Sequence, residues 1–342
     1  MNKKLKVCVA GASGFVGQEL IKLLVKHPHV EIMHLFVNNL ESQDTELIKK
    51  HKLPDFKKID LKLINDCDVL FSAMPHTYSQ SIIKSVSENL VVLDLSADFR
   101  LSNAETYENW YNVKHESKDL LKKAVYGLSE IFRDEIKRSN LIACPGCYPT
   151  SVLLPMIPLL KENLINTNEI IIDSKSGYSG AGKKTLDTEL YPQIEKNIAT
   201  YGLSNHRHVP EIEEYLNMYI DNKTQINFTP HLIPTFRGIL STIYIKSNFN
   251  LIKLSECLLD FYKNSEFIRF YKKKLINTNE VINTNYCNIS INENISKQES
   301  SNLSFSLKII DNIFIYIIPS SLNLEIKIAA FSLLSFPSII ST

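Results

Sequence analysis

The fold of this chain is decided by one stretch near its start, KVCVAGASGFVG at residues 6–17. Residues 6–10 predict a buried strand, and the glycines that follow predict a tight turn. From residue 16 to residue 24, valine and leucine repeat with the 3.6-residue period of a helix face, and Pro28 ends the segment. A strand, a glycine turn and a helix in this order predict an α/β fold that begins with a Rossmann-type parallel sheet.

The three glycines of this turn have distinct physical purposes. Gly11 permits the tight turn, Gly14 lets backbone N–H groups approach a pyrophosphate, and Gly17 allows close packing of the helix. The spacing is GxxGxxG, and a glycine turn without a ligand is the alternative interpretation, but the flanking strand and helix favour a dinucleotide site. The predicted cofactor contacts in this turn are Gly11, Ser13, Gly14, Phe15, Val16 and Gly17.

The end of the second predicted strand bears on the choice of dinucleotide. An acidic residue there would bind the ribose 2′-hydroxyl of NAD, but residues 36–39 read Phe-Val-Asn-Asn. No carboxylate at this place would repel a 2′-phosphate, and Asn38, Asn39 and Ser13 could donate hydrogen bonds to one. The sequence therefore favours NADP as the cofactor.

The rest of the chain predicts two domains. Strand candidates at 31–37, 68–74 and 90–95, with a helical pattern at 77–87, continue the α/β rhythm of a parallel sheet. After Cys147 the rhythm changes to a helix at 150–162 and strands at 169–173, 238–246 and 304–310. The stretch 272–301 is rich in Asn, Lys and Ser, and we expect it to include a solvated loop. We therefore predict an NADP-binding Rossmann domain at 1–147 and a second, α+β domain at 148–312.

Composition and charge exclude several classes of protein. The chain has 342 residues, a length typical of about two domains, and 44% are hydrophobic, as in soluble globular proteins. The 38 Lys and Arg and 37 Asp and Glu residues leave a formal net charge of +1, which offers no basic field to nucleic acid or an anionic membrane. The apolar stretch at 313–340 is interrupted by Pro319, Glu325, Lys327 and Pro337, so we do not expect a membrane span. Six cysteines in 342 residues are too few for a disulfide scaffold, and the first residues do not resemble a secretory signal. We therefore expect reduced thiols and a cytoplasmic protein.

The segment CPGCYPT at 144–150 carries the strongest candidate for chemistry. A Cys-x-x-Cys pair is compatible with a dithiol redox motif or half of a zinc site, but Cys257 and Cys287 do not supply a second ligand pair, and we expect no metal. A single nucleophile at a helix start, where the dipole favours thiolate, is the other interpretation, and Pro149 is a helix-start signal. An inert buried cysteine is the plain alternative.

Three further segments offer partners for such a nucleophile. NHRHVPEI at 205–212 holds two histidines that could move protons near neutral pH, or it is an exposed loop, and its spacing does not place it beside Cys147. The serine- and glycine-rich run at 174–184 could wrap a phosphate or form a flexible turn. Arg100 and Arg237 could each grip an anion or form an ordinary surface ion pair.

Taken together, these segments resemble the N-acetyl-gamma-glutamyl-phosphate reductase family, which is related to aspartate-semialdehyde dehydrogenase. The matching segments follow the family's order over almost the whole chain. They are GASGFVG at 11–17, MPH at 74–76, DLSADFR at 94–100, YGLSE at 126–130, PGCYPT at 145–150, SGAGK at 179–183, HRHVPEI at 206–212, FTPHLIP at 228–234, RGI at 237–239 and TNYC at 284–287.

The resemblance implies NADPH-dependent reduction of N-acetyl-glutamyl-5-phosphate to N-acetyl-glutamate 5-semialdehyde, with release of phosphate, in arginine biosynthesis. It implies that Cys147 forms a thioester, with His206 as acid/base and His208 as a substrate contact, or with the two roles exchanged. It also implies a homo-oligomer, a dimer or tetramer, assembled through the second domain. The remaining residues that it implies are Arg100 and Ser176 for the substrate and Asn38, Gly180, Gly182 and Asn312 for the cofactor.

The chain departs from the family pattern at two places. Cys144 stands where many relatives have Asn, and residues 313–342 are apolar and strand-like where relatives have a glycine-rich turn and a helix that completes the cofactor domain. Three alternatives follow. They are an enzyme like aspartate-semialdehyde dehydrogenase, which the HRHVPEI segment opposes, a non-catalytic nucleotide-binding remnant, and a dithiol redox protein using Cys144 and Cys147.

Overall fold

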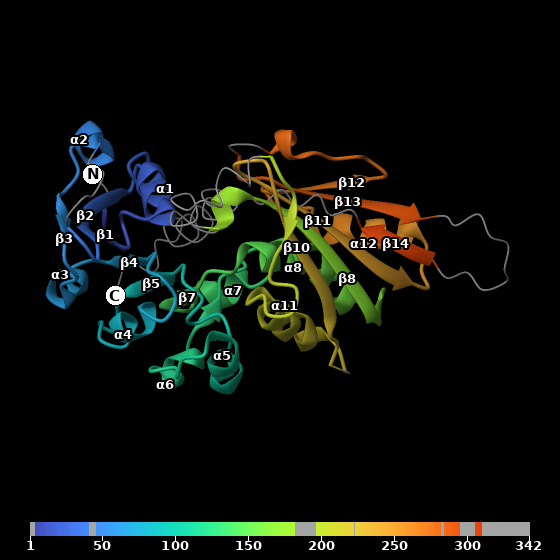
Figure 1. The fold of residues 1–342 in the computed structure, drawn as a ribbon, viewed down its shortest axis with the longest axis horizontal. Coiled ribbons are helices and arrows are strands. Elements are labelled where there is room, and N and C mark those ends of the chain that lie inside the picture. The colour runs from blue at the N-terminus through green and yellow to red at the C-terminus, as the bar shows by residue number, and fades with distance from the viewer. Residues whose placement is uncertain are drawn as a thin grey trace. The chain divides into compact units, whose positions relative to one another are not determined.

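The computed structural model describes residues 4–40, 46–181, 196–221, 223–281, 284–294 and 305–309. These residues divide into two compact units, the first ending at Pro145 and the second beginning at Gly146 (Figure 1). The predictions made on Gly182, Asn312 and the tail at 313–342 fall outside the described residues.

The first unit is built on a seven-stranded sheet in the order β3-β2-β1-β4-β5-β7-β6, and each pairing is parallel. Its strands are β1 Leu5–Ala10, β2 Val30–Phe36, β3 Phe56–Lys57, β4 Val69–Ser72, β5 Val91–Asp94, β6 Val125–Tyr126 and β7 Leu141–Ala143. Its helices are α1 Phe15–Leu24, α2 Glu46–His51, α3 Leu61–Asn65, α4 Ser79–Ile83, α5 Ala104–Tyr111, α6 Lys118–Leu121 and α7 Arg133–Ile136. The predicted Rossmann-type parallel sheet is confirmed.

The helix expected at 77–87 is confined to α4. Thr77 has a φ of 75°, in the left-handed region that a right-handed helix cannot include. Beyond the other end, the N–H of Ser87 donates to the side chain of Asn65 and not to a helical carbonyl. The side-chain pattern alone did not reveal these two backbone constraints.

The second unit carries a mixed seven-stranded sheet in the order β12-β13-β14-β11-β8-β10-β9. Its strands are β8 Asn166–Gly177, β9 Ala199–Thr200, β10 Ile226–Ile233, β11 Ile239–Ser247, β12 Ile268–Lys272, β13 Cys287–Asn294 and β14 Phe305–Ile309. Its helices are α8 Cys147–Lys161, α11 His208–Leu216 and α12 Leu251–Tyr262, with 3-10 turns η1 Tyr178–Ala181, η2 Asn217–Tyr219 and η3 Thr278–Glu280. The predicted α+β character of this part of the chain is confirmed.

The two faces of this second sheet have different chemistry. Along β8, Ile170, Ile172 and Ser174 are buried, whereas Ile171 between them is 45% exposed. Helix α8 packs on β11, and α11 and α12 both pack on α8, so the three helices form a layer on the face that contains Ile172. The opposite face carries Ile171 and an ion pair of 2.6 Å between Asp173 and Lys175.

Helix α8 starts at Cys147, earlier than the predicted start at residue 150, and it includes two internal prolines. Pro158 has no N–H to donate to the carbonyl of Leu154, one helical turn before it. The hydroxyl of Tyr262, at the end of α12, donates to that carbonyl instead. A buried acceptor released by the proline is thus satisfied by another helix.

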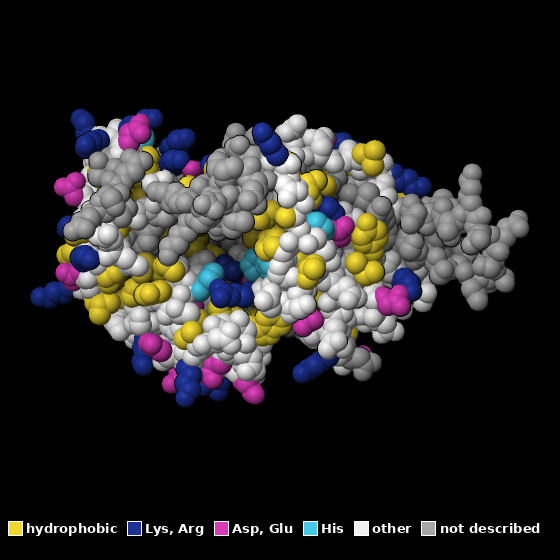
Figure 2. Space-filling model, viewed as in Figure 1, with side chains coloured by type: hydrophobic (Ala, Val, Ile, Leu, Met, Phe, Trp, Pro, Cys, Tyr) yellow, Lys and Arg dark blue, Asp and Glu magenta, His cyan; other side chains and the backbone are white. Residues whose placement is uncertain are grey.

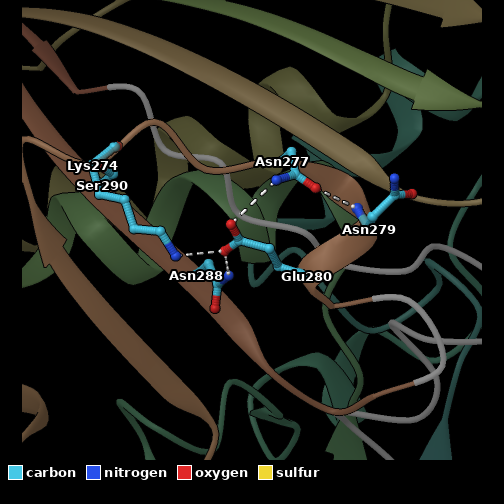
Figure 3. Close-up of polar contacts among 6 residues, drawn as sticks. All are labelled: Lys274, Asn277, Asn279, Glu280, Asn288 and Ser290. Atoms are coloured by element: carbon cyan, nitrogen blue, oxygen red, sulfur yellow. Dashed lines mark hydrogen bonds and ion pairs between the residues drawn. The ribbon is translucent and has the colours of Figure 1, made fainter.

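The stretch at 272–301, expected to include a solvated loop, contains η3 and strand β13 among its described residues. Cys287, Ile289 and Ile291 are fully buried, and so are Asn288 and Ser290 between them, so both faces of this strand are covered. The Glu280 carboxylate accepts hydrogen bonds from Lys274 Nζ at 3.0 Å, Asn288 Nδ2 at 3.0 Å and Asn277 Nδ2 at 3.2 Å (Figure 3). The polar composition therefore concealed a strand.

Two properties bear on possible partners. Among the described helices, none has both the length and the apolarity to cross a bilayer. Basic and acidic side chains are interspersed over the described residues of the face shown in Figure 2, in keeping with the formal net charge of +1. This mixed surface provides little long-range attraction for a polyanion.

Candidate active site

Cys147 is the first residue of α8, the position predicted for a helix-start nucleophile. Gly146 before it is extended, with φ −69° and ψ 156°, and serves as the N-cap. The Cys147 side chain is half-buried. The Cys147 side chain therefore lies at the positive end of the α8 dipole.

Glu211 connects the start of α8 with the first turn of α11. Its carboxylate is 1% exposed, and its Oε1 accepts a hydrogen bond of 2.6 Å from the N–H of Gly146. Helix α11 begins at His208, so this bond fixes the histidine segment against the helix that carries Cys147. The sequence placed Glu211 in a motif but predicted no role for it.

His206 lies in a cage of aromatic rings. Ring centroids of Tyr148, Tyr201, His208 and Phe228 lie 5.5, 5.4, 4.9 and 5.2 Å from the centroid of the His206 ring, each in an edge-to-face arrangement. The Tyr148 ring also contacts His208, at 5.8 Å. The spacing of the sequence left the place of these histidines open, and the structure brings both of them to the residue that follows Cys147.

The cage fixes the chemical state of His206. Its Nδ1 accepts a hydrogen bond of 3.2 Å from the backbone N–H of His208, so the ring carries its proton on Nε2. Burial, and then the positive charge of Arg207, lower the pKa of His206 to about 4. His206 is therefore a neutral hydrogen-bond donor near pH 7.

Tyr148 and Tyr201 form a pair of phenols close to Cys147. Their hydroxyl oxygens are 2.9 Å apart. Burial is the main cause that raises the pKa of each phenol, and the charge of Cys147 contributes to both shifts. The sulfur therefore lies within electrostatic reach of both hydroxyls, which stay protonated.

Ser176, predicted as a substrate contact, is 1% exposed on β8. Its hydroxyl donates to the carbonyl of Gly177 at 2.9 Å and also bonds the Tyr148 hydroxyl. Nearby, the Ser151 hydroxyl donates to the Tyr148 carbonyl at 2.7 Å and lies 2.7 Å from the Ser241 hydroxyl. These hydroxyls fasten the first turns of α8 to the sheet, and the substrate role of Ser176 stays a prediction.

Tyr148, Tyr201 and Phe228 are the site residues that sequence reasoning missed. Tyr148 lies next to Cys147 in the quoted segment, and Phe228 begins another matching segment, but neither position indicates a contact with His206. Tyr201 lies outside all the matching segments. Its only sequence signal is its position shortly before His206.

The predicted dinucleotide turn lies in the first unit, between β1 and α1. Gly11 has a φ of 80°, and a Cβ there would lie 2.2 Å from the carbonyl oxygen of Ala73. A Cβ at Gly17 would lie 2.3 Å from the oxygen of Gly11. Gly14 is the extended N-cap of α1, and Ser13, Phe15 and Val16 beside it are half-buried. This glycine turn at a helix N-terminus fits the pyrophosphate of a dinucleotide.

The end of β2 adds a cation that the sequence did not indicate. Asn38 is exposed there, and its carbonyl accepts a hydrogen bond of 2.8 Å from Lys58 Nζ. Lys58 follows β3, which pairs with β2. The position that distinguishes the two dinucleotides therefore combines amide groups with a lysine, a donor set that suits a 2′-phosphate.

Arg100 is mostly buried in the first unit. Its Nε donates to the carbonyl of Cys144 at 2.7 Å and its Nη2 to that of Leu95 at 3.1 Å. Cys144 itself is 1% exposed. These bonds engage part of the guanidinium with the backbone, and the expected anion contact of Arg100 stays a prediction.

The other predicted positions are less informative. Gly180 lies in η1 and is exposed. Over the described ranges, no group of three or more His, Cys, Asp or Glu side chains is arranged to hold a metal ion. Gly180 stays a predicted cofactor contact.

Two family models match the chain. One, described as the semialdehyde dehydrogenase NAD binding domain, matches residues 6–139. The other, described as the semialdehyde dehydrogenase dimerisation domain, matches residues 147–312. Together they span the two units.

Three curated proteins are 40–43% identical to the chain over most of its length. It is 43% identical over 298 residues to N-acetyl-gamma-glutamyl-phosphate reductase from Alkaliphilus metalliredigens, covering 83% of this chain and 85% of that protein. It is 42% identical over 303 residues to the protein of the same name from Ehrlichia ruminantium, covering 85% of this chain and 86% of that protein. It is 40% identical over 296 residues to a probable chloroplastic N-acetyl-gamma-glutamyl-phosphate reductase from Arabidopsis thaliana, covering 84% and 74%.

Solved structures agree with the fold. An aspartate semialdehyde dehydrogenase with NADP from Candida albicans matches with a TM-score of 0.64 and 17% identity, covering 98% of this chain and all of that one. Aspartate semialdehyde dehydrogenase II from Vibrio cholerae matches with a TM-score of 0.64 and 13% identity over the same shares. At these identities the likeness shows the fold alone.

Proposed function

The chain belongs to the N-acetyl-gamma-glutamyl-phosphate reductase family of semialdehyde dehydrogenase proteins, and on this premise we propose how its residues carry out the family reaction. The reaction is NADPH-dependent reduction of N-acetyl-glutamyl-5-phosphate to N-acetyl-glutamate 5-semialdehyde, with release of phosphate, a step of arginine biosynthesis. The observation that carries the proposal is the position of Cys147 at the start of α8, next to a ring that contacts both histidines.

The thiolate of Cys147 attacks the acyl carbon of the substrate. A C–S bond forms, the C–O bond to phosphate breaks, and phosphate leaves with the electron pair, so that the acyl group is held as a thioester. NADPH, when bound, supplies the hydride that reduces this acyl group. Cys147 is then released when the C–S bond breaks and the aldehyde forms.

The geometry favours the exchanged assignment of the two histidines. His206 has its Nδ1 engaged by the His208 N–H and a pKa of about 4, so it is suited to donate a hydrogen bond from Nε2 to the acyl oxygen. His208 then takes the proton of the Cys147 thiol and returns it during aldehyde release. Glu211 supports this role by fastening α11 to the N-cap of α8.

The cofactor is NADP. Gly11, Gly14 and Gly17 would hold its pyrophosphate at the N-terminus of α1. Asn38 and Lys58 would bind its 2′-phosphate, since the Lys58 ammonium donates a hydrogen bond to the Asn38 carbonyl and so lies beside this residue. Gly180 and, outside the described residues, Gly182 and Asn312 are further cofactor contacts.

The family of the second unit is named for dimerisation, which supports a homo-oligomer. A second copy covers the face of the second sheet opposite its helices, where Ile171 and the Asp173–Lys175 pair lie, in a dimer or in a tetramer made of two such dimers. We place the protein in the cytoplasm because six cysteines in 342 residues are too few for a disulfide scaffold. We propose that the site binds small molecules and not nucleic acid. Light scattering of the purified chain and of Ile171→Lys tests the assembly.

The reaction itself is tested in reverse with purified protein. N-acetyl-glutamate 5-semialdehyde, NADP and phosphate should give NADPH, and omission of phosphate should stop its formation. Aspartate semialdehyde in place of the acetylated substrate should give little NADPH. Equal rates with both aldehydes would instead favour an enzyme like aspartate-semialdehyde dehydrogenase, and no NADPH with either would favour a non-catalytic protein.

A further inference from the structure

The Tyr148 and Tyr201 hydroxyls join the two segments that carry the reacting side chains. Tyr148 directly follows Cys147 in α8, and Tyr201 precedes His206 in the chain after β9. Their hydroxyl oxygens are 2.9 Å apart, although the residues are 53 positions apart in sequence. A single hydroxyl contact therefore spans the nucleophile's helix and the histidine segment.

The Tyr148 side of this contact is rigid. The side chain is 1% exposed, its hydroxyl also bonds Ser176 on β8, and its ring packs against Phe228 on β10 at 5.2 Å. The carbonyl of Tyr148 accepts a further bond from Ser151. Tyr148 is thus fixed to the sheet through its hydroxyl and its ring, and its carbonyl is bonded within α8.

The His206 side of this contact is a turn, at the end of which the N–H of Val209 donates to the His206 carbonyl at 3.0 Å. The N–H of Tyr201 donates to the carbonyl of Pro230 at 3.2 Å, and Gly202, with a φ of 58°, then turns the chain. Residues 203–205 and Arg207 are exposed, Leu203 by 57%. A Cβ on Gly202 would lie 3.2 Å from Cδ2 of His206, so the ring rests directly on this turn.

We propose that the Tyr148–Tyr201 hydroxyl pair is a clamp that holds the His206 turn against the nucleophile's helix, which makes Tyr201 a positioning residue for the reaction. This inference rests on the proposed function for its catalytic consequence. The clamp keeps the His206 ring in its cage, with Nδ1 on the His208 N–H and the Nε2 proton directed to the acyl oxygen. Neither phenol transfers a proton.

The test uses Tyr201→Phe, which keeps the ring against His206 and removes only the hydroxyl. Its matched control is Tyr262→Phe, which also removes a buried hydroxyl that donates to α8, at the carbonyl of Leu154. We expect Tyr201→Phe to lower kcat about tenfold with KM within about twofold of the wild type, the size of one lost hydrogen bond. Tyr262→Phe should keep kcat within about twofold.

A second readout does not depend on turnover. In protein labelled with 15N-histidine, the imidazole nitrogens of His206 should report one tautomer, protonated on Nε2, and assignment comes from His206→Gln. In Tyr201→Phe the same signals should move towards a mixture of tautomers. If the wild type does not reduce the substrate, the proposed function fails, whereas these signals still decide whether the clamp exists.

A double-mutant cycle isolates the hydroxyl pair. Tyr148→Phe combined with Tyr201→Phe should cost no more than Tyr148→Phe alone, because either change already breaks the bond. Additive losses would overturn the proposal, as would unchanged kcat and His206 signals in Tyr201→Phe, or an equal loss in Tyr262→Phe. Failure of both tyrosine variants to fold, with Tyr262→Phe folded, would assign the pair to folding and also overturn the clamp.

Discussion

The N–H of Gly146 and the buried carboxylate of Glu211 are joined by a hydrogen bond of 2.6 Å across 65 positions of sequence. Gly146 is the N-cap of the helix that starts with Cys147, and Glu211 lies in the first turn of the helix that starts with His208. The bond therefore sets the distance between the nucleophile and the proposed acid/base without touching either reacting atom.

Removal of this acceptor should destabilise the protein. Glu211→Ala leaves the Gly146 N–H buried without its carboxylate, so we expect the free energy of unfolding to fall by about 2 kcal/mol in urea titrations. Glu211→Gln retains an oxygen acceptor and should lose less than half as much. If Gln and Ala cost the same, the charge and not the Gly146 bond is what matters.

The two cysteines of the CPGC segment should differ sharply in function. Cys147→Ser should abolish phosphate-dependent formation of NADPH, because a serine hydroxyl is not ionised at neutral pH. Cys144→Ser should retain most of the activity, since Cys144 is 1% exposed. Loss of activity in both variants to the same extent would support the dithiol interpretation.

The histidines should separate in their pH dependence. The pKa of His206 is lowered to about 4, so it is neutral at every pH between 5 and 8 and cannot produce a limb in that range. His206→Ala should lower kcat about a hundredfold while the pH profile keeps its shape. His208→Ala should lower kcat by about 10² to 10⁴, as expected for loss of a general acid/base. If His206→Ala instead removes a limb of the pH profile between pH 5 and 8, His206 is the acid/base.

Asp94 should make stability depend on pH with a defined sign. Burial, and then the charge of Asp98, raise the pKa of Asp94 from 3.8 to about 6. The folded state therefore binds more protons than the unfolded state between pH 4 and 6, and this contribution to stability is lost as pH rises through 6. Relative to Asp94→Asn, the wild type should lose up to about 3 kcal/mol of unfolding free energy between pH 4 and pH 7. A difference that is constant across this range would contradict the shift.

The dinucleotide turn should respond differently at two of its glycines. Gly11→Ala forces a Cβ to within 2.2 Å of the Ala73 oxygen at a φ of 80°, so thermal melting should shift to lower temperature. At Gly14 the nearest atom to a Cβ is 3.5 Å away, so Gly14→Ala should melt like the wild type. Its methyl group would meet the pyrophosphate, and the Kd for NADP should rise about tenfold in a fluorescence titration. An unchanged Kd for NADP in Gly14→Ala would show that the pyrophosphate does not bind at this turn.

What the sequence could predict depended on how far apart the interacting residues lie. The β1 strand, the glycine turn and α1 interact within residues 5–24, so their local pattern was sufficient. The helix was predicted to start at residue 150, three residues after its observed start at Cys147, although Pro149 is a helix-start signal.

The contacts that build the site could not be predicted in this way. Tyr148 and Tyr201 are 53 positions apart and Gly146 and Glu211 are 65 positions apart, and neither pair leaves a periodic signal. Strand β13 was concealed because Asn288 and Ser290 within it find partners in Glu280 and in the Lys274 carbonyl rather than in water. Lys58 reaches the end of β2 only through the pairing of β3 with β2.

The carbonyl of Leu154 in α8 finds its donor 108 positions later, in the hydroxyl of Tyr262. As the chain is synthesised, the Leu154 carbonyl therefore gains its Tyr262 donor only after α12 has been made. Until then this acceptor, released by Pro158, has to be satisfied by water or by another group.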